Sequence, residues 1–226
     1  METFEPTART RIRRLPKRAR YDRATVHAIL DAGLVCHVGY TIDDHPYVTA
    51  TSCWREGDRV YWHGSSASRM LRRQRAGVPV CLNVSLIDGL VLARSGFHHS
   101  VNYRTVMLFG TATPVTDDAL KLRALEAFVE RLFPGRWAEL RPVTPQELKA
   151  TMVLGMDIAE AAAKVRTGPP VDDKEDYALD VWAGVLPLRL TAGVPVADPR
   201  LQPGVPLPDY LKGFDLEAYA VREAAE

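Results

Sequence analysis

The stretch LVCHVGYTIDDHPYVTATSCWREGDRVYWH, residues 34–63, decides the fold. Apolar, aromatic and β-branched residues fill three runs, and turn-forming residues separate them. The three runs are residues 34–41, 47–55 and 59–63. The connections between them are too short for a crossover, so consecutive strands must pair antiparallel. We therefore expect an antiparallel meander and not a doubly wound parallel sheet.

Helical periodicity appears on both sides of this meander. Residues 24–32 place apolar side chains at helical spacing, with Asp22 as the expected N-cap and Gly33 at the stop. A second amphipathic helix is expected over residues 118–133, capped by Asp117. Both helices therefore interrupt a chain that otherwise alternates in the manner of strands.

The rest of the chain to residue 166 adds strands and short helices. Further strands are expected at residues 80–86, 89–93, 103–115 (with Gly110 as a candidate bulge) and 151–161, and shorter helices at 66–76 and 145–149. Six or seven strands with helical insertions predict a mainly β chain with helical decoration (α+β), folded as an antiparallel barrel.

Composition limits the class of protein. The chain has 226 residues, of which 46% are hydrophobic and 25% charged, and 29 Lys and Arg oppose 28 Asp and Glu. A net charge of +1 gives no reason to expect a nucleic-acid or membrane partner. No apolar run approaches the roughly 20 residues needed to span a bilayer, and no secretory signal is evident.

Composition also divides the chain into three parts. Residues 1–20 form a basic arm that either is solvated or wraps a partner subunit, and residues 21–167 form the barrel. Residues 168–226 form a proline-rich extension, which we expect to pack on the barrel or on a partner subunit.

The cysteines and histidines indicate no metal site. Cys36, Cys53 and Cys81 match no CxxC pattern and are expected to be buried, reduced thiols, which favours a cytoplasmic protein. The adjacent His98 and His99 point to opposite sides of an extended chain and have no third ligand nearby.

The strongest signal for a binding site is the strand-to-helix turn GSSAS at residues 64–68, followed by Arg69. The first turn of a helix presents unpaired N–H groups, and serine hydroxyls and a guanidinium add donors suited to a phosphate. The alternative is ordinary N-capping beside exposed arginines. The Walker, GxGxxG and GxSxG patterns are all missing.

A second polar segment, HHSVNYR at residues 98–104, is dense in hydrogen-bond donors. His99, Asn102 and Tyr103 could line the polar edge of a heteroaromatic ligand. The alternative is a turn whose side chains bond to the local backbone.

The order of these motifs resembles the pyridoxamine 5′-phosphate oxidase-like, FMN-binding split-barrel superfamily. Within it, the chain most resembles the flavin-nucleotide-binding and nitroimidazole-resistance branch. The motifs, over roughly residues 18–188, are RYD (20–22), VYWHGS (60–65), SR (68–69), DGLVLAR (88–94), HSVNYR (99–104), FG (109–110), FPGR (133–136), KVR (164–166) and WAG (182–184).

The resemblance implies a split-barrel homodimer that binds FMN in a groove near the subunit interface. It implies that Ser68 and Arg69 hold the phosphate with a neighbouring strand, and that His63, the candidate catalytic residue, lies close to the flavin. The expected cofactor-binding residues are Thr49, Ala50, Thr51, Ser52, His63, Gly64, Ser65, Ser68, Arg69, Asn102, Tyr103, Arg104 and Trp182. The oxidase itself carries Lys where this chain has Met70, which argues against oxidase activity on pyridoxamine phosphate.

The expected function is therefore that of an FMN-binding flavoprotein, an oxidoreductase acting on a small molecule. The flavin would supply the redox chemistry, and the protein would anchor and orient it. One alternative is a non-catalytic protein that binds flavin, haem or a pyridoxal-phosphate-type ligand on the same barrel. Another is a deazaflavin-dependent reductase.

Overall fold

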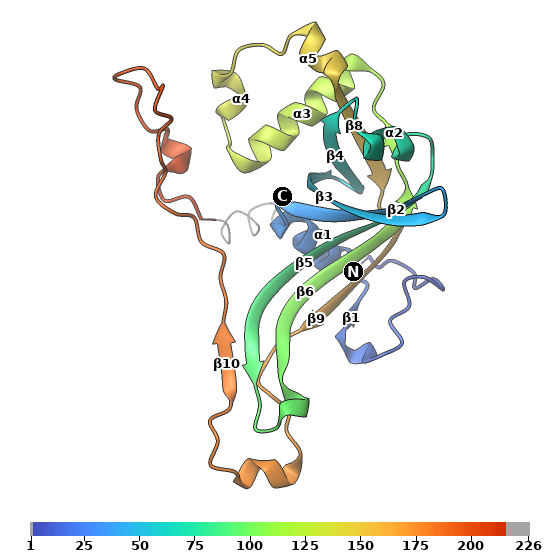
Figure 1. The fold of residues 1–226 in the computed structure, drawn as a ribbon, viewed down its shortest axis with the longest axis vertical. Coiled ribbons are helices and arrows are strands. Elements are labelled where there is room, and N and C mark those ends of the chain that lie inside the picture. Colours follow the sequence, from blue (N-terminus) through green and yellow to red (C-terminus); the bar gives the residue numbers. More distant parts are fainter. Residues whose placement is uncertain (1, 216–226) are drawn as a thin grey trace.

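The computed structural model describes residues 2–215, and within them one antiparallel sheet of ten strands forms the body (Figure 1). The strands are β1 (Ala19–Arg20), β2 (Val35–Ile42), β3 (His45–Glu56), β4 (Arg59–Ser65), β5 (Pro79–Leu92), β6 (Ser100–Thr111), β7 (Thr113–Pro114), β8 (Thr151–Asp157), β9 (Glu160–Arg166) and β10 (Gly184–Pro187). Their order is β1-β9-β6-β5-β2-β3-β4-β8-β7, with β10 added to β5. β1 and β7 are the two ends of this path and do not pair with each other. The described sheet is therefore a barrel that stays open, as the split-barrel prediction requires.

Short helices decorate this barrel. The α-helices are α1 (Arg23–Ala32), α2 (Arg69–Gln74), α3 (Asp118–Leu132), α4 (Arg136–Glu139) and α5 (Pro145–Ala150), and the 3-10 turns are η1 (Pro16–Arg18), η2 (Gly96–His98), η3 (Lys174–Ala178) and η4 (Asp209–Leu211). None of these described helices is long and apolar enough to cross a membrane.

The meander predicted from residues 34–63 is confirmed as β2, β3 and β4. Asp43 and Asp44 connect β2 to β3 and both adopt positive φ, 49° and 61°. Two left-handed residues in succession match the right-handed twist of a tight hairpin. The ends of α1 are also as predicted, because the Asp22 side chain accepts the Thr25 N–H at 2.9 Å and Gly33 follows the last turn.

Two predictions along β5 and β6 are wrong. Residues 80–86 and 89–93 belong to one strand, β5, and the register shift lies between Ile87 and Gly89 and not at Gly110. Gly110 pairs regularly with Val80, but a Cβ at this position would lie 2.7 Å from Met156 Sδ. The glycine therefore allows β8 to pack closely against β6.

The predicted strand 151–161 is two strands, β8 and β9, which reverse at residues 158–159. Apolar residues continue through this turn, so periodicity alone cannot reveal the reversal. The structure also shortens the helix expected at 66–76 to α2, and contains α4 and β10, which the sequence pattern did not predict.

The core fills the inside of the barrel and continues under α3. Val38, Trp62, Leu82, Leu108 and Leu154 are all fully buried in the barrel core. A second cluster, built on Trp54, Ala124 and Val153, lies between the sheet and α3. The outer face of β3, β4 and β8 is therefore covered by a helix.

Arg131 of α3 ties three elements together. Its guanidinium is buried and donates to the carbonyl oxygens of Cys53 at 2.6 Å, Gly33 at 3.3 Å and Leu30 at 3.4 Å, and also to that of Asp31. These bonds occupy the carbonyls at the end of α1 and one on β3. One arginine thus fixes where α1 ends relative to the sheet and to α3.

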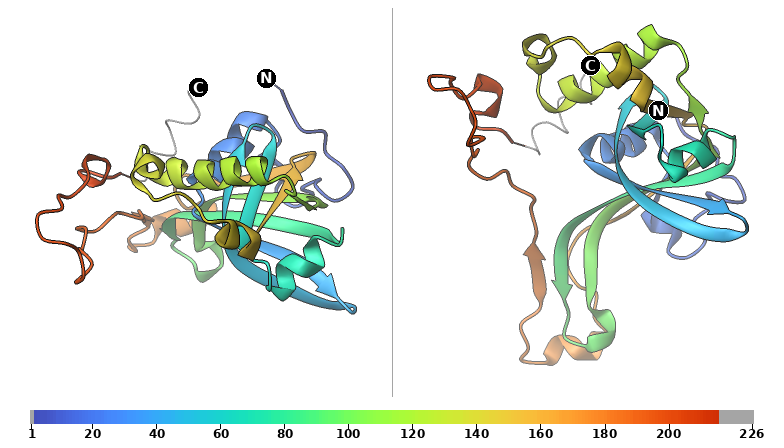
Figure 2. Two further views of the ribbon diagram at one scale, coloured as in Figure 1. Left: turned by 90° about the horizontal axis from the view of Figure 1, so that it is seen from above. Right: turned by 45° about the horizontal axis from the view of Figure 1, so that its top comes forward.

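The far halves of β5 and β6 leave the barrel as a long hairpin arm, with residues 166–187 beside it (Figure 1). Beyond β10, residues 188–207 run apart from the body in all three views (Figures 1 and 2) and are exposed throughout. The chain contacts the body again at Tyr210, whose ring lies 6.1 Å from that of Phe133. The described part of the C-terminal extension, residues 168–215, therefore contacts its own barrel at both ends and leaves its middle uncovered.

Candidate functional site

The predicted phosphate anchor is an exposed corner where β4 turns into α2. Ser65 Oγ accepts the Ala67 N–H at 3.2 Å, and Ser68 is the N-cap whose Oγ accepts the Leu71 N–H at 3.5 Å. These bonds are those of ordinary N-capping, which is the alternative to a phosphate site. A hydroxyl that accepts such a bond retains its own proton, so both serines can still donate to an anion.

Arg69 joins this corner to β3. Its guanidinium carbon lies 4.9 Å from the centroid of the Tyr47 ring, a cation–π distance. Gly64 on β4 lets α2 pack closely on that neighbouring strand, because a Cβ there would lie 3.1 Å from Leu71 Cδ1. The structure therefore brings together the turn residues Gly64, Ser65, Ser68 and Arg69 and the first half of β3.

The four predicted residues on β3 do not share one face. Alternation along the strand places Thr49 and Thr51 on the side of the buried Cys53, and Ala50 and Ser52 on the side of Trp54. Thr49 Oγ1 is 3.1 Å from the hydroxyl of the buried Tyr40. A ligand along one face of β3 could contact only two of these four side chains.

His63 lies on β4, two residues before Ser65, and points toward α3. Its ring centroid is 4.9 Å from that of Phe128 and 5.6 Å from that of Trp54. Neither ring nitrogen bonds to a described residue, and Nδ1 is completely buried. Burial lowers the pKa of His63, so the imidazole is neutral at neutral pH.

This lack of partners separates His63 from most other histidines. His27 lies 3.1 Å from Asp58, His45 Nδ1 2.7 Å from the Asp43 carbonyl, His98 3.3 Å from Asp173 and His99 Nδ1 2.9 Å from the Ser95 carbonyl. His37 also has no partner, but it is exposed. His63 is therefore the partly buried imidazole that is free to bind a ligand.

The remaining predicted residues lie on the hairpin arm. Asn102 is buried, donates to the Gly168 carbonyl at 3.1 Å and accepts a bond from Arg166 Nη1. Arg104 forms a two-pronged pair with Asp88, at 2.7 Å and 3.0 Å. These contacts are structural but not local: Asn102 holds the arm to residues 166–168, and Arg104 joins β6 to β5.

The last two predicted residues are Tyr103, on the hairpin arm, and Trp182, in the segment beside it. Tyr103 is half-buried and pairs with Arg166 across β6 and β9, and Trp182 is 70% exposed. Figure 1 shows the arm extending away from α2. Within one chain, these side chains are therefore not brought together with the corner at Ser68 and Arg69.

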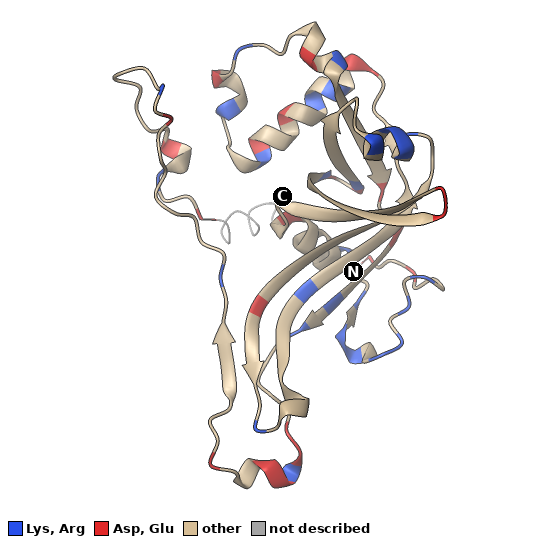
Figure 3. Ribbon diagram, in the orientation of Figure 1, with Lys and Arg blue, Asp and Glu red and all other residues tan. Residues whose placement is uncertain are grey.

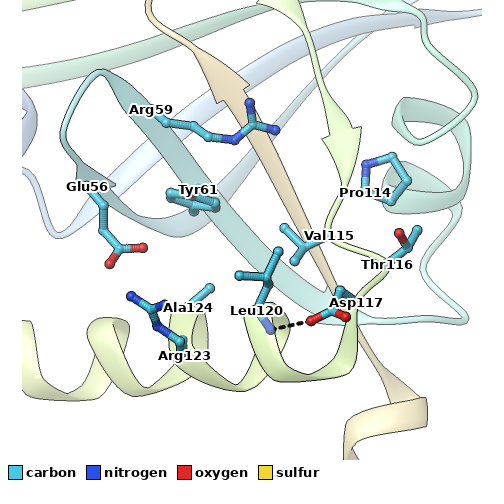
Figure 4. Close-up of a pocket in the computed structure, with 10 residues that line it drawn as sticks. All are labelled: Glu56, Arg59, Tyr61, Pro114, Val115, Thr116, Asp117, Leu120, Arg123 and Ala124. Carbon is cyan, nitrogen blue, oxygen red and sulfur yellow. Dashed lines mark hydrogen bonds between the residues drawn. The ribbon is translucent and has the colours of Figure 1, made fainter.

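A separate groove of about 490 Å³ opens between α3 and the β3–β4 turn (Figure 4). Glu56, Tyr61 and Arg123 line it, and Asp117 at its end accepts the Leu120 N–H at 2.8 Å. Burial raises the pKa of Glu56. Sequence reasoning did not single out this groove, since its lining comes from segments about 60 residues apart.

Two aromatic rings, those of Tyr61 and Trp54, connect the groove to His63. Tyr61 stacks on Trp54 at 5.7 Å between centroids, and Trp54 contacts His63. Among the described residues, no cluster of three or more His, Cys, Asp or Glu side chains could hold a metal ion.

Comparison with known proteins identifies a family that matches this chain. A family described as pyridoxamine 5′-phosphate oxidase matches residues 22–165, which run from α1 through β8 and include β9 except its last residue. The chain belongs to this family. The resemblance inferred from the motifs is thereby confirmed, and the match spans the corner, His63 and the arm residues 102–104.

Solved structures extend the likeness beyond the barrel. The flavocytochrome Anf3 from Azotobacter vinelandii is 50% identical, with a TM-score of 0.89, and the alignment covers 93% of this chain and 98% of that one. An FAD and haem binding protein from Mycobacterium smegmatis is 37% identical, with a TM-score of 0.84, over 88% of this chain and 97% of that one.

More distant structures share the fold alone. A proposed 5-nitroimidazole antibiotic resistance protein from Bacteroides thetaiotaomicron is 21% identical, with a TM-score of 0.54, over 65% of this chain and 86% of that one. No curated protein matched the chain.

Proposed function

We propose that this protein binds a flavin nucleotide and a haem, and acts as an oxidoreductase. The observation that carries the proposal is the half-buried imidazole of His63, which bonds to no described residue, in a chain that is 50% identical, over 93% of its length, to a flavocytochrome. The 37% identical structure binds FAD and haem by its own description. Flavin was the cofactor expected from the sequence, and haem was one of the alternatives.

The residues present fit a flavin phosphate at the corner. Ser65 and Ser68 would donate their hydroxyl protons, and Arg69 would add a charge-assisted bond. Tyr47 holds the Arg69 guanidinium beside β3 before any ligand arrives. The flavin would supply two-electron chemistry, and this corner would anchor and orient it. Extraction of the nucleotide distinguishes FMN, which the motifs suggest, from FAD, which the Mycobacterium smegmatis protein binds.

The residues also fit a haem at His63. A neutral imidazole between Trp54 and Phe128 can ligate iron, and the aromatic rings would exclude water from one side. Haem would supply one-electron chemistry. The family resemblance made His63 the candidate catalytic residue close to the flavin, and in this proposal His63 binds the haem.

We further propose that the active form is a homodimer. Val35, Val48, Ile87 and Met107 project from β2, β3, β5 and β6 and are 42–70% exposed. Leu190, Val194 and Val196 of the extension are 70–93% exposed. Exposed apolar groups on this scale indicate an interface. Tyr210, near the end of the described extension, packs on its own chain.

Spectroscopy and extraction test the cofactors. We expect the purified protein to show a Soret band and flavin absorption, and to release a flavin nucleotide on acid treatment. His63→Ala should lose the Soret band and keep the flavin, whereas His37→Ala, which changes an exposed histidine without partners, should keep both. A wild-type protein that takes up neither cofactor would refute the proposal, and a full Soret band in His63→Ala would refute the role of His63.

A further inference from the structure

The N-terminal arm, residues 7–20, carries a concentration of positive charge. It contains seven Lys and Arg and no Asp or Glu, whereas the remainder of the chain contains 22 Lys and Arg against 28 Asp and Glu. The total of +1 therefore conceals a segment of charge +7 in a chain whose other residues sum to −6. The overall charge of +1, which gave no reason to expect a charged partner, misses this asymmetry.

The arm is docked on the barrel and does not extend freely into solvent. Strand β1 pairs with β9, and Thr7 Oγ1 donates to Glu160 at 2.8 Å. The Ile12 N–H donates to the Tyr21 hydroxyl at 2.9 Å, and Thr10 is buried. Backbone and small side chains thus face the body, which holds the charged side chains in a fixed arrangement.

The basic side chains have little to neutralise them. Arg9 pairs with Glu160, but none of the other six forms an ion pair with a described carboxylate. These six are Arg11, Arg13, Arg14, Lys17, Arg18 and Arg20, and all but the half-buried Arg18 are exposed. Figure 3 shows the blue segments along the arm. Like charges held this closely repel one another, and an anionic partner would relieve that repulsion.

We propose that this arm is the docking surface for a small acidic electron-transfer protein. The inference rests on the proposed function, because a bound flavin or haem must exchange electrons with a donor. A compact acidic protein can contact the arm alone. Charge complementarity of this kind accelerates encounter and selects the partner.

The surrounding surface favours a compact partner over an extended polyanion. A nucleic acid longer than the arm would pass over residues 21–187, which carry 18 Lys and Arg against 20 Asp and Glu and so offer phosphates no further net attraction. The arm offers no helix beyond the three residues of η1 to enter a groove, and Leu15 is its one exposed large apolar side chain for a lipid surface.

Binding to acidic electron carriers tests the proposal. The full-length protein, with its cofactors, would be titrated by calorimetry with a plant-type [2Fe–2S] ferredoxin and with a flavodoxin, at low and at high salt. We expect salt-sensitive binding to at least one carrier. Replacing Arg11, Arg13 and Arg14 by Gln should weaken it about tenfold, since each exposed charge contributes a factor of about two.

A matched control separates the effect of charges on the N-terminal arm from the effect of net charge on carrier binding. Arg123, Lys149 and Lys174 are exposed and lie outside the arm, and their joint replacement by Gln should leave the affinity for the carrier unchanged. Circular dichroism would verify that both triple variants are folded.

Three results would overturn the assignment. These are no binding of either carrier to the wild type at low salt, unchanged binding in the arm variant, and tighter binding to a DNA duplex or to anionic vesicles than to either carrier. Flavin and haem content would be measured on the same samples. If the protein binds a carrier but contains neither flavin nor haem, the proposed function is refuted and the docking surface is not. If it contains the cofactors but binds neither carrier, the docking surface is refuted and the proposed function is not.

Discussion

Replacing Arg69 by Ala removes the cation from the corner proposed to anchor the flavin phosphate. The side chain is exposed and rests on Tyr47, so its loss should leave the fold intact. A charge-assisted hydrogen bond contributes about 1.5–3 kcal/mol, and about 1.4 kcal/mol corresponds to a tenfold change in affinity. We therefore expect FMN to bind about 10- to 100-fold more weakly to the variant. The lower end is favoured because the site is open to solvent.

Riboflavin separates a phosphate contact from a general loss of shape. It has no phosphate, so wild type and Arg69→Ala should bind it equally weakly, and added salt should weaken FMN binding more than riboflavin binding. Arg72 lies three residues further along α2 and is also exposed, so Arg72→Ala is the control. Titrations would be followed by quenching of flavin fluorescence. Equal FMN affinity in wild type and Arg69→Ala would refute the assignment of the corner.

Three further predictions concern stability, assembly and pH. Arg131→Ala should lower the free energy of unfolding by about 3 kcal/mol in urea, because several buried carbonyls lose their donor; a change below the error of the melt would mean that water replaces the guanidinium. Light scattering at micromolar concentration should give twice the 25.1 kDa chain mass, and a monomer would contradict the dimer. The lowered pKa of His63 means that the unfolded state binds its proton first as pH falls, so stability of the cofactor-free protein should drop below about pH 6.5. In His63→Ala this drop should shrink, and an identical pH profile would show that His63 contributes nothing to it.

Local signals in the sequence predicted local structure well. The turn at residues 43–44 and the N-cap Asp22 occur where short-range chemistry requires them, and the helix expected at 145–149 begins with a capping box of Thr144 and Glu147. Each depends on residues within four positions of one another, which a sequence displays directly. The strand-to-helix corner at Ser68 belongs to the same class.

Long-range partners could not be predicted in this way. Asn102 was a candidate for ligand binding because its segment is rich in donors, but its partner Arg166 lies 64 positions away. The buried carboxylate of Asp172 similarly pairs with Arg94 at 3.0 Å, 78 positions away. A segment dense in donors fits both a ligand site and a structural junction, and only the position of the distant partner distinguishes the two.

Mixed dimers can test whether the two separated groups of predicted residues form one site. The corner at Ser68 and Arg69 lies at the start of α2, whereas Trp182 lies just before β10, in the segment beside the hairpin arm, and is 70% exposed. If a flavin contacts both groups, the corner must come from one subunit and the arm from the other. Arg69→Ala and Trp182→Ala would then each weaken both sites of a homodimer. A dimer with one subunit of each variant would contain one site with both defects and one site with none. We therefore expect that mixing the two variants, with subunit exchange confirmed by mass spectrometry, restores tight flavin binding at one site per mixed dimer. Mixed dimers that bind no more tightly than the parent variants would show that each site is built within a single chain, and Trp182 would then lie outside it.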